Sequence, residues 1–283
     1  MPDVTVVVPT FERPEETRNA VLSALAQTHP PLEVVVVDDG SAEPFAFDHD
    51  HDHDHERVRV VRHERNRGAA AARNTGVREA RGTVIAFLDS DDRWLPPKLG
   101  RQLPLLAPGS AVATGWIEER DGRLASRIRI PRESQGARDF FAGCWFCPGS
   151  TLVVARADFE RCGPFDETLP RLEDWEWSMR FARMGGALRV APIAGAVITI
   201  GMRNSVAAVS EAARRIRPTL ADDPRAHARA AQAYLDKELA AAHRNAGNTG
   251  AFLFHMARSL ARVPRRRASL RDWWRTEPVR EIP

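Results

Sequence analysis

Residues 4–10 read VTVVVPT, and residues 33–41 read EVVVVDDGS. Each stretch contains an unbroken run of β-branched residues, which is typical of a strand buried on both faces, and each ends in residues that favour turns. Pro14 stands between the two stretches where a helix can begin, and apolar residues follow it at helical spacing as far as Leu25. This part of the sequence predicts a strand, a helix and a second strand parallel to the first.

The same alternation continues through the first hundred residues. Residues 58–61 and 84–88 have the pattern of buried strands, and the alanine-rich residues 68–81 predict a helix between them. Strands that alternate with helices predict an α/β fold with a mostly parallel sheet and helices on both faces. Ligands of such sheets bind beyond the carboxyl ends of the strands, where the polar residues of this sequence gather.

The composition limits the partners that the chain can have. The 283 residues include 41 Lys and Arg against 38 Asp and Glu, a net charge of +3. Residues 1–205 carry a small acidic excess and residues 206–283 are arginine-rich, so we expect no nucleic acid bound along the chain. Three cysteines cannot build a disulfide framework, and the N-terminus lacks the features of a leader. We expect a cytoplasmic protein, at most peripheral at the inner face of the membrane.

Three carboxylates follow the fourth predicted strand, at Asp89, Asp91 and Asp92. Like charges this close raise one another's pKa unless a cation lies among them. Oxygen ligands suit Mg²⁺ or Mn²⁺, which commonly complete their coordination with substrate phosphates. Alternatively, Asp91 or Asp92 caps a helix that begins near Pro96. The cluster by itself leaves both interpretations open.

Six short segments, taken together and in this order, resemble the family 2 glycosyltransferases of the GT-A fold. They are residues 6–14, 36–41, 66–76, 87–102, 163–167 and 173–175. The resemblance covers roughly the first 180 residues, and the last hundred match little. It implies a Rossmann-like GT-A domain that uses a nucleotide sugar.

The resemblance also assigns expected roles to residues. Asp39 would accept a hydrogen bond from uracil N3–H, which favours a UDP-sugar donor. Asp89 and Asp91 match the DXD motif and would hold the metal, with Asp91 favoured as the direct ligand. The residues expected at the nucleotide sugar are Pro9, Thr10, Glu12, Asp39, Gly68, Arg73, Asn74, Asp89 and Ser90. Local roles stay open for some of them: Asp38 and Ser41 can form an Asx turn, and Arg73 can pair with a nearby carboxylate.

Glu173 and Asp174 form a second carboxylate pair. By resemblance, Asp174 is the general base that removes the acceptor proton opposite the leaving group, in one in-line displacement that inverts the sugar carbon. The alternative is structural, because acidic residues also favour a helix N-terminus.

The acceptor side is less defined. Trp145 and Phe146, between Cys144 and Cys147, are expected to border the acceptor together with Glu173 and Trp175. Core packing with inert thiols is the competing interpretation, and a redox or zinc site is a third. The acceptor can be a carbohydrate, a lipid-linked glycan, a natural product or a peptide.

Two features depart from the family pattern. Residues 200–205 contain no histidine where many relatives carry one, and Arg203 is either a contact for the diphosphate or a surface residue. Residues 48–56 alternate Asp and His, which indicates either a metal site or a solvated low-complexity loop.

We expect three parts: a nucleotide-sugar-binding half at residues 1–110, an acceptor-binding half at 111–205, and a helical, arginine-rich extension at 206–283. Residues 222–248 and 250–263 predict two long helices. Residues 258–275 contain seven arginines and Trp273 and Trp274, which favours either peripheral contact with an anionic membrane or packing on the catalytic domain, and a partner protein is also possible.

Two functions are consistent with these patterns. The first is an inverting, metal-dependent glycosyltransferase of glycan or glycoconjugate biosynthesis. The second is a non-catalytic relative that binds nucleotide and docks on a membrane or partner.

Overall fold

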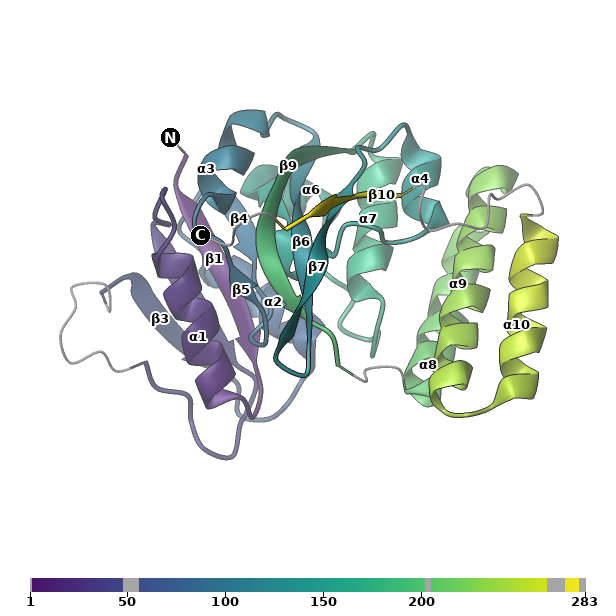
Figure 1. Cartoon of the computed structure of the whole chain (residues 1–283), viewed down its shortest axis with the longest axis horizontal. Helices are drawn as coiled ribbons and strands as arrows, with labels where there is room; N and C mark the ends of the chain where they lie inside the picture. The colour runs from purple at the N-terminus through teal and green to yellow at the C-terminus, as the bar shows by residue number, and fades with distance from the viewer. Residues whose placement is uncertain (1, 48–55, 202–204, 264–272, 280–283) are drawn as a thin grey trace.

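The computed structural model describes residues 2–47, 56–201, 205–263 and 273–279. One twisted sheet runs through the centre of the molecule, helices cover both of its faces, and a group of helices stands at one end (Figure 1). The predicted α/β fold with a C-terminal helical part is confirmed. The Asp and His run within residues 48–55, Arg203, and the arginines of 264–272 lie outside the described residues.

The N-terminal half of the sheet is parallel, as the β-branched runs predict. Its strands lie in the order β3, β2, β1, β4, and Val7 at the centre is paired with Val35 on one side and Phe87 on the other. The four strands are β1 (Val4–Thr10), β2 (Glu33–Asp38), β3 (Val58–Arg62) and β4 (Val84–Phe87).

The other half of the sheet is largely antiparallel, which corrects the expectation of a mostly parallel sheet. Here β4 pairs with β8, β8 with β6, β6 with β7, and β7 with β10, all antiparallel, whereas β9 runs parallel to β6 and also carries β5. Asp121 and Gly122 have positive φ, as a tight hairpin turn between β6 and β7 requires. These strands are β5 (Arg93–Trp94), β6 (Ser110–Arg120), β7 (Arg123–Pro131), β8 (Val153–Ala155), β9 (Ala187–Thr199) and β10 (Trp274–Pro278).

The helices divide between the two faces because side chains alternate along β1. Val6 and Val8 pack with α1 and α3, and Val7 packs with α2, α6 and α7 on the opposite face. The helices of the α/β domain are α1 (Pro14–Leu25), α2 (Ala69–Glu79), α3 (Lys98–Gln102), η2 (Leu103–Leu105), α4 (Ala137–Ala142), α5 (Pro148–Thr151), α6 (Arg156–Cys162) and α7 (Glu173–Arg183).

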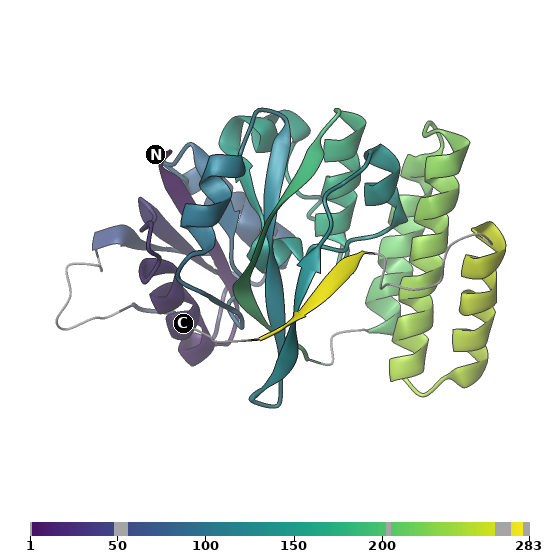
Figure 2. The same ribbon diagram turned by 45° about the horizontal axis from the view of Figure 1, so that its top comes forward.

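The C-terminal helices form a separate group beside α4 and α7. Figures 1 and 2 both place α10 outermost, with α9 between it and the sheet. Tyr234 of α9 packs on Trp175 of α7 with ring centroids 4.7 Å apart. Within the described residues, no helix is both long and apolar enough to cross a membrane. The group consists of α8 (Val206–Ile216), η3 (Arg217–Leu220), α9 (Arg225–Asn245) and α10 (Thr249–Arg262).

The extension is not wholly helical, because β10 returns to the edge of the sheet (Figure 2). The Trp274 indole donates a hydrogen bond to the Trp145 carbonyl and lies edge-on to Trp116 at 6.0 Å. Trp273 packs against Trp145 at 5.8 Å. The two tryptophans that the sequence offered for membrane contact therefore pack on the α/β domain.

Candidate active site

A cleft of about 320 Å³ opens beyond the carboxyl ends of β1, β2 and β4. This is where α/β sheets bind ligands, because the loops after adjacent parallel strands meet at one edge. Eight residues predicted for the nucleotide sugar or the metal line it together: Pro9, Thr10, Asp39, Gly68, Arg73, Asp89, Ser90 and Asp91.

Asp39 is held by three donors. Its carboxylate accepts hydrogen bonds from the Arg67 and Gly68 amides, at 2.9 and 2.7 Å, and lies 2.6 Å from Nδ1 of His63. The other ring nitrogen of His63 lies 2.9 Å from the Thr75 hydroxyl. The Arg67 amide also lies 3.1 Å from the second oxygen of Asp39, so these contacts already occupy the roughly four acceptor positions of the carboxylate. Sequence reasoning missed His63, although it immediately follows β3 at the same edge of the sheet.

The turn after β2 is tied to the loop after β1. Asp38 accepts hydrogen bonds from the amides of Ser41 and Phe45, which is the Asx-type turn considered from the sequence. Burial by itself would raise the pKa of Asp38, but these hydrogen bonds lower it below its usual value. Glu12 accepts from the Ala42 amide at 2.7 Å and does not line the cleft. Glu12 therefore holds these two loops together and does not lie in the cleft where the base and ribose were expected.

Asn74 also lies away from the cleft. Its side chain donates to the Phe165 carbonyl at 2.9 Å and accepts from the Phe165 amide at 2.9 Å. It also donates to Glu167 at 3.0 Å. These contacts fix the loop at residues 163–167 against α2, whereas the sequence had placed Asn74 beside the diphosphate.

Arg73 joins the two carboxylate pairs that the sequence singled out. Its guanidinium donates to Asp89 at 2.6 Å and to Glu173 at 2.7 Å. Burial by itself would lower the pKa of Arg73, but Asp89 and Glu173 raise it, so the side chain stays charged. The alternative that Arg73 pairs with a carboxylate is confirmed, and the pairing brings α7 to the edge of the cleft.

Asp89, Asp91 and Asp92 can hold a metal ion. One oxygen from each lies within 4.8 Å of the others, and an all-oxygen set suits a hard divalent cation. Asp91 also lies 3.0 Å from Arg13, a half-exposed side chain that can move aside. The structure rules out the capping alternative, because α3 begins only after Pro97 and no side chain caps it.

Asp92 is the buried member of this cluster. It accepts hydrogen bonds from the Ser150 hydroxyl at 2.5 Å and the Thr199 amide at 2.8 Å. Burial and the neighbouring Asp89 raise its pKa to about 7.

Two residues of α5 contact Asp89. The Ser150 hydroxyl accepts a hydrogen bond from the Asp89 amide at 3.0 Å, and a Cβ at Gly149 would lie 2.5 Å from an oxygen of Asp89. Only glycine leaves room for the carboxylate there. Sequence reasoning missed this contact.

Asp174 lies in the first turn of α7. It accepts a hydrogen bond from the Trp175 amide at 2.6 Å and lines a small hollow with Arg73 and Gly149. Burial, and then the adjacent Glu173, raise the pKa of Asp174 to about 6. A carboxylate with such a pKa can accept a proton near neutral pH.

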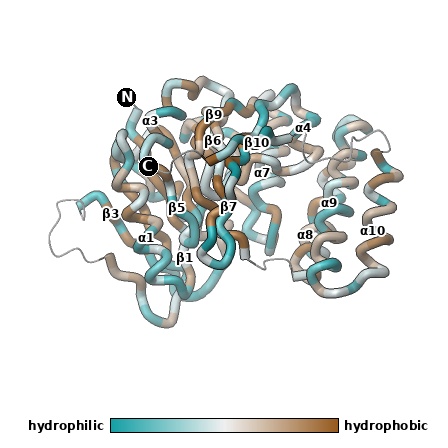
Figure 3. The backbone as a smooth tube through the Cα atoms, viewed as in Figure 1, coloured by the Kyte–Doolittle hydropathy of each residue, from teal (hydrophilic) through white to brown (hydrophobic). Residues whose placement is uncertain are grey.

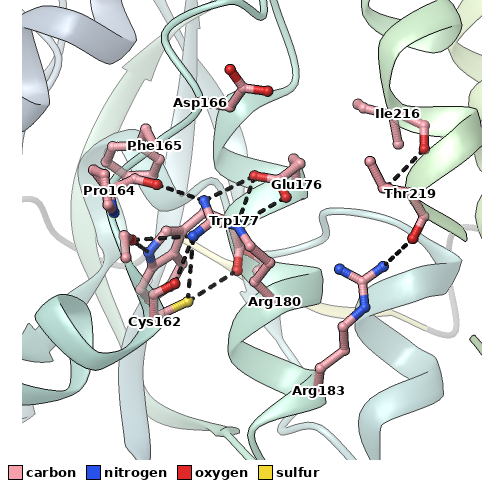
Figure 4. A network of polar contacts seen from close by, with 12 residues as sticks. Cys162, Pro164, Phe165, Asp166, Glu176, Trp177, Arg180, Arg183, Ile216 and Thr219 are labelled. Carbon is pink, nitrogen blue, oxygen red and sulfur yellow. Dashed lines mark hydrogen bonds and ion pairs between the residues drawn. The ribbon is translucent and has the colours of Figure 1, made fainter. Parts of the chain in front are cut away.

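A hydrogen-bond network anchors α7 to the loop that borders the site (Figure 4). Arg180 donates to the carbonyls of Cys162 at 2.7 Å and Pro164 at 2.6 Å, and pairs with Glu176 at 2.9 Å. Residues 162–165 are thereby held from α7 by Arg180 and from α2 by Asn74.

The aromatic residues expected at the acceptor are core residues. Trp145, Phe146 and Trp175 are at most 1% exposed, and the indole nitrogens of the two tryptophans donate to main-chain carbonyls. A side chain this buried cannot touch an acceptor, so the acceptor contact is corrected to core packing. Cys144 and Cys147 are free thiols, and burial raises the pKa of both. Of the expected acceptor residues only Glu173 lies near the cleft, because it accepts a hydrogen bond from Arg73, which lines the cleft.

The sequence profile of glycosyl transferase family 2 matches residues 5–163, which is more than half of the chain. The chain belongs to glycosyl transferase family 2. The resemblance inferred from the six motifs is thereby confirmed, and the cleft at the ends of β1, β2 and β4 lies within the matched part of this glycosyltransferase domain.

Relatives and solved structures agree with this assignment. An uncharacterized glycosyltransferase of Rickettsia felis is 38% identical over 68% of this chain and 32% of its own length. The succinoglycan biosynthesis protein ExoO of Rhizobium meliloti is 33% identical over 71% of this chain and 61% of its own. The chain thus spans less than two thirds of either relative. The crystal structure of residues 1–349 of S. aureus TarS has a similar fold, with a TM-score of 0.58 at 19% identity, and the match covers 93% of this chain and 81% of that one.

Proposed function

We propose that the protein is an inverting, divalent-metal-dependent glycosyltransferase that moves a sugar from a nucleoside diphosphate sugar to an acceptor. The observation that carries the proposal is the contact of Arg73 with both Asp89 and Glu173. This contact joins the carboxylates proposed for the donor to the pair that contains the proposed base. A non-catalytic nucleotide-binding relative needs no such connection.

The donor site is proposed to be the cleft beside Asp39. By the family resemblance Asp39 would accept the N3–H of uracil, in place of the longer of its two contacts with the Arg67 amide, so a UDP-sugar is favoured. The diphosphate would lie beside Gly68, Arg73 and Ser90. Among the described residues, the buried Nε of Arg73 has no hydrogen-bond acceptor, which leaves a donor for an anionic ligand.

Mn²⁺ or Mg²⁺ would be held by Asp89 and Asp91, with Asp92 as a neighbouring carboxylate. When bound, the ion supplies positive charge against the leaving nucleoside diphosphate. Arg13, which lies 3.0 Å from Asp91, would move aside for the ion. Glu12 and Asn74 keep the surrounding loops in place in this proposal.

Asp174 is the proposed general base. Its raised pKa, about 6, lets it take the proton of an acceptor hydroxyl at neutral pH. Glu173 keeps Arg73 in place and thereby positions the adjacent Asp174. The inversion of the sugar carbon follows from family membership.

The acceptor is proposed to be a glycan or glycoconjugate intermediate. Support comes from ExoO, whose name places it in succinoglycan biosynthesis. A carbohydrate or lipid-linked acceptor is therefore favoured over a peptide.

Calorimetric titration with UDP and Mn²⁺ tests the proposal. The native protein should bind UDP more tightly with Mn²⁺ than without, and Asp91→Ala should remove that difference while still binding UDP. If UDP affinity did not depend on the metal in either protein, the metal-dependent enzyme would be rejected in favour of the non-catalytic relative.

A further inference from the structure

Helix α10 presents an apolar face outward. Beyond its first residue, every exposed residue of this helix is Gly, Ala, Leu or Phe: Gly250, Leu253, Phe254, Ala257, Leu260 and Ala261. Leu253, Phe254 and Leu260 are 59%, 56% and 47% exposed. An ordinary surface helix shows charged or polar residues on this side.

The polar residues of α10 face inward instead. Arg262 donates to the buried carboxylate of Asp236 in α9 at 2.8 Å, and Arg258 and His255 lie 3.7 and 3.6 Å from the same group. The Ser259 hydroxyl donates to a main-chain carbonyl of α9 at 2.7 Å. These contacts fix the rotation of the helix, so the apolar face cannot turn inward without breaking them.

The helical group that carries this face is basic. Its described residues, 205–263, contain nine Lys and Arg against five Asp and Glu. Arg258 lies over the ring of Phe254 at 5.4 Å, so a cation borders the apolar face directly. Figure 3 shows hydrophobic segments along α10 although it is the outermost helix in Figures 1 and 2.

We propose that the outer face of α10, defined by Leu253, Phe254, Ala257, Leu260 and Ala261, docks on an anionic lipid bilayer. A helix with an apolar face bordered by arginines lies in the plane of a membrane interface, with its apolar side chains among the acyl chains. Arg258, which borders the face, would bind the lipid phosphates, and the basic excess of the helical group would favour an anionic surface. This contact differs from the one predicted from the sequence, because Trp273 and Trp274 take no part in it.

A second copy of the chain is the main competing occupant. Self-association would bring two helical groups with a basic excess against each other, and like charges repel. A bilayer of anionic lipids supplies the opposite charge and the apolar phase together.

Vesicle co-sedimentation tests the proposal. The full chain should pellet with vesicles of phosphatidylglycerol and phosphatidylethanolamine, and remain in the supernatant with vesicles of phosphatidylcholine alone. The double variant Leu253→Glu/Phe254→Glu should lower the partition onto the anionic vesicles about a hundredfold, because it replaces apolar burial by repulsion.

The matched control is Leu32→Glu/Val60→Glu. It adds the same charge at two exposed apolar residues of the α/β domain, 44% and 40% exposed, and should bind vesicles like the native chain. Circular dichroism melting checks that both variants fold. Equal binding of the α10 variant and the control would overturn the proposal. So would light scattering that shows a native dimer, dissociated by the α10 variant, with no vesicle binding.

Discussion

Arg73 connects the carboxylates that we assign to the donor with those that we assign to the acceptor. It is buried, charged and bound to both Asp89 and Glu173. Sequence motifs placed each of these residues near the site but could not show that one guanidinium joins them. The connection depends on where α7 packs, and that packing is determined by residues distant in the sequence.

Asp174→Asn should lower the rate of sugar transfer by roughly 10²- to 10⁴-fold, the usual contribution of a general base. In the native enzyme the rate should rise with pH through about 6, because Asp174 must lose its proton to act and its pKa is about 6. A pH–rate profile under saturating donor measures this. A native profile that stays flat from pH 5 to 8 would rule out Asp174 as the base.

His63→Ala should weaken UDP binding about tenfold, because Asp39 loses the hydrogen bond that orients it. Calorimetric titration with UDP measures the change. His29→Ala serves as the control and should bind UDP normally, because His29 lies between α1 and β2, at the edge of the parallel sheet opposite the cleft. A His63 variant with native affinity would show that Asp39 is held sufficiently by the two amides.

At the scale of elements, the strands and helices of the first hundred residues were predictable from local patterns. The β-branched runs and helical spacing predict β1 to β4, α1 and α2, and the polar strand ends predict the cleft. The second half was less predictable, because β6 to β10 pair with strands remote in the sequence and their direction is set by those pairings. The roles of Trp145 and Trp175 were also unpredictable. The sequence near a site motif is the same whether an aromatic side chain contacts a ligand or packs in the core.

Gly149→Ala should lower metal-dependent turnover at least about tenfold with little change in melting temperature. The added Cβ would lie 2.5 Å from Asp89, whose carboxylate is held by Arg73 and would have to shift. Gly100→Ala is the control, since its Cβ would meet the nearest atom at 3.5 Å. Enzyme assays across a Mn²⁺ titration measure the effect. If the Gly149 variant kept the native metal dependence, the position of the Asp89 carboxylate would not matter for metal binding.

Trp274→Ala should destabilise the fold by about 2 kcal/mol, because it leaves a cavity beside Trp116 and removes the contact with Trp145. Urea denaturation measures the free energy of unfolding, with the exposed Arg275→Ala as control. A variant as stable as the control would indicate that β10 contributes little to the sheet.

At the scale of the whole molecule, the net charge of +3 separates into two unlike parts. Carboxylates gather at the carboxyl end of the sheet, and the basic excess lies in residues 206–283. A truncation before Arg265 cannot separate sugar transfer from membrane binding, because it also removes β10. Point substitutions on α10 separate them, since that face lies apart from the cleft.

The central claim is that the cleft beyond β1, β2 and β4 is a metal-dependent glycosyltransferase site. Release of UDP from a panel of UDP-sugars, measured with and without Mn²⁺, tests it most directly. The account predicts that at least one sugar is hydrolysed or transferred only with metal, and that Asp91→Ala and Asp174→Asn each reduce this rate by about 10²-fold or more. Metal-independent release that is unchanged in both variants would contradict it.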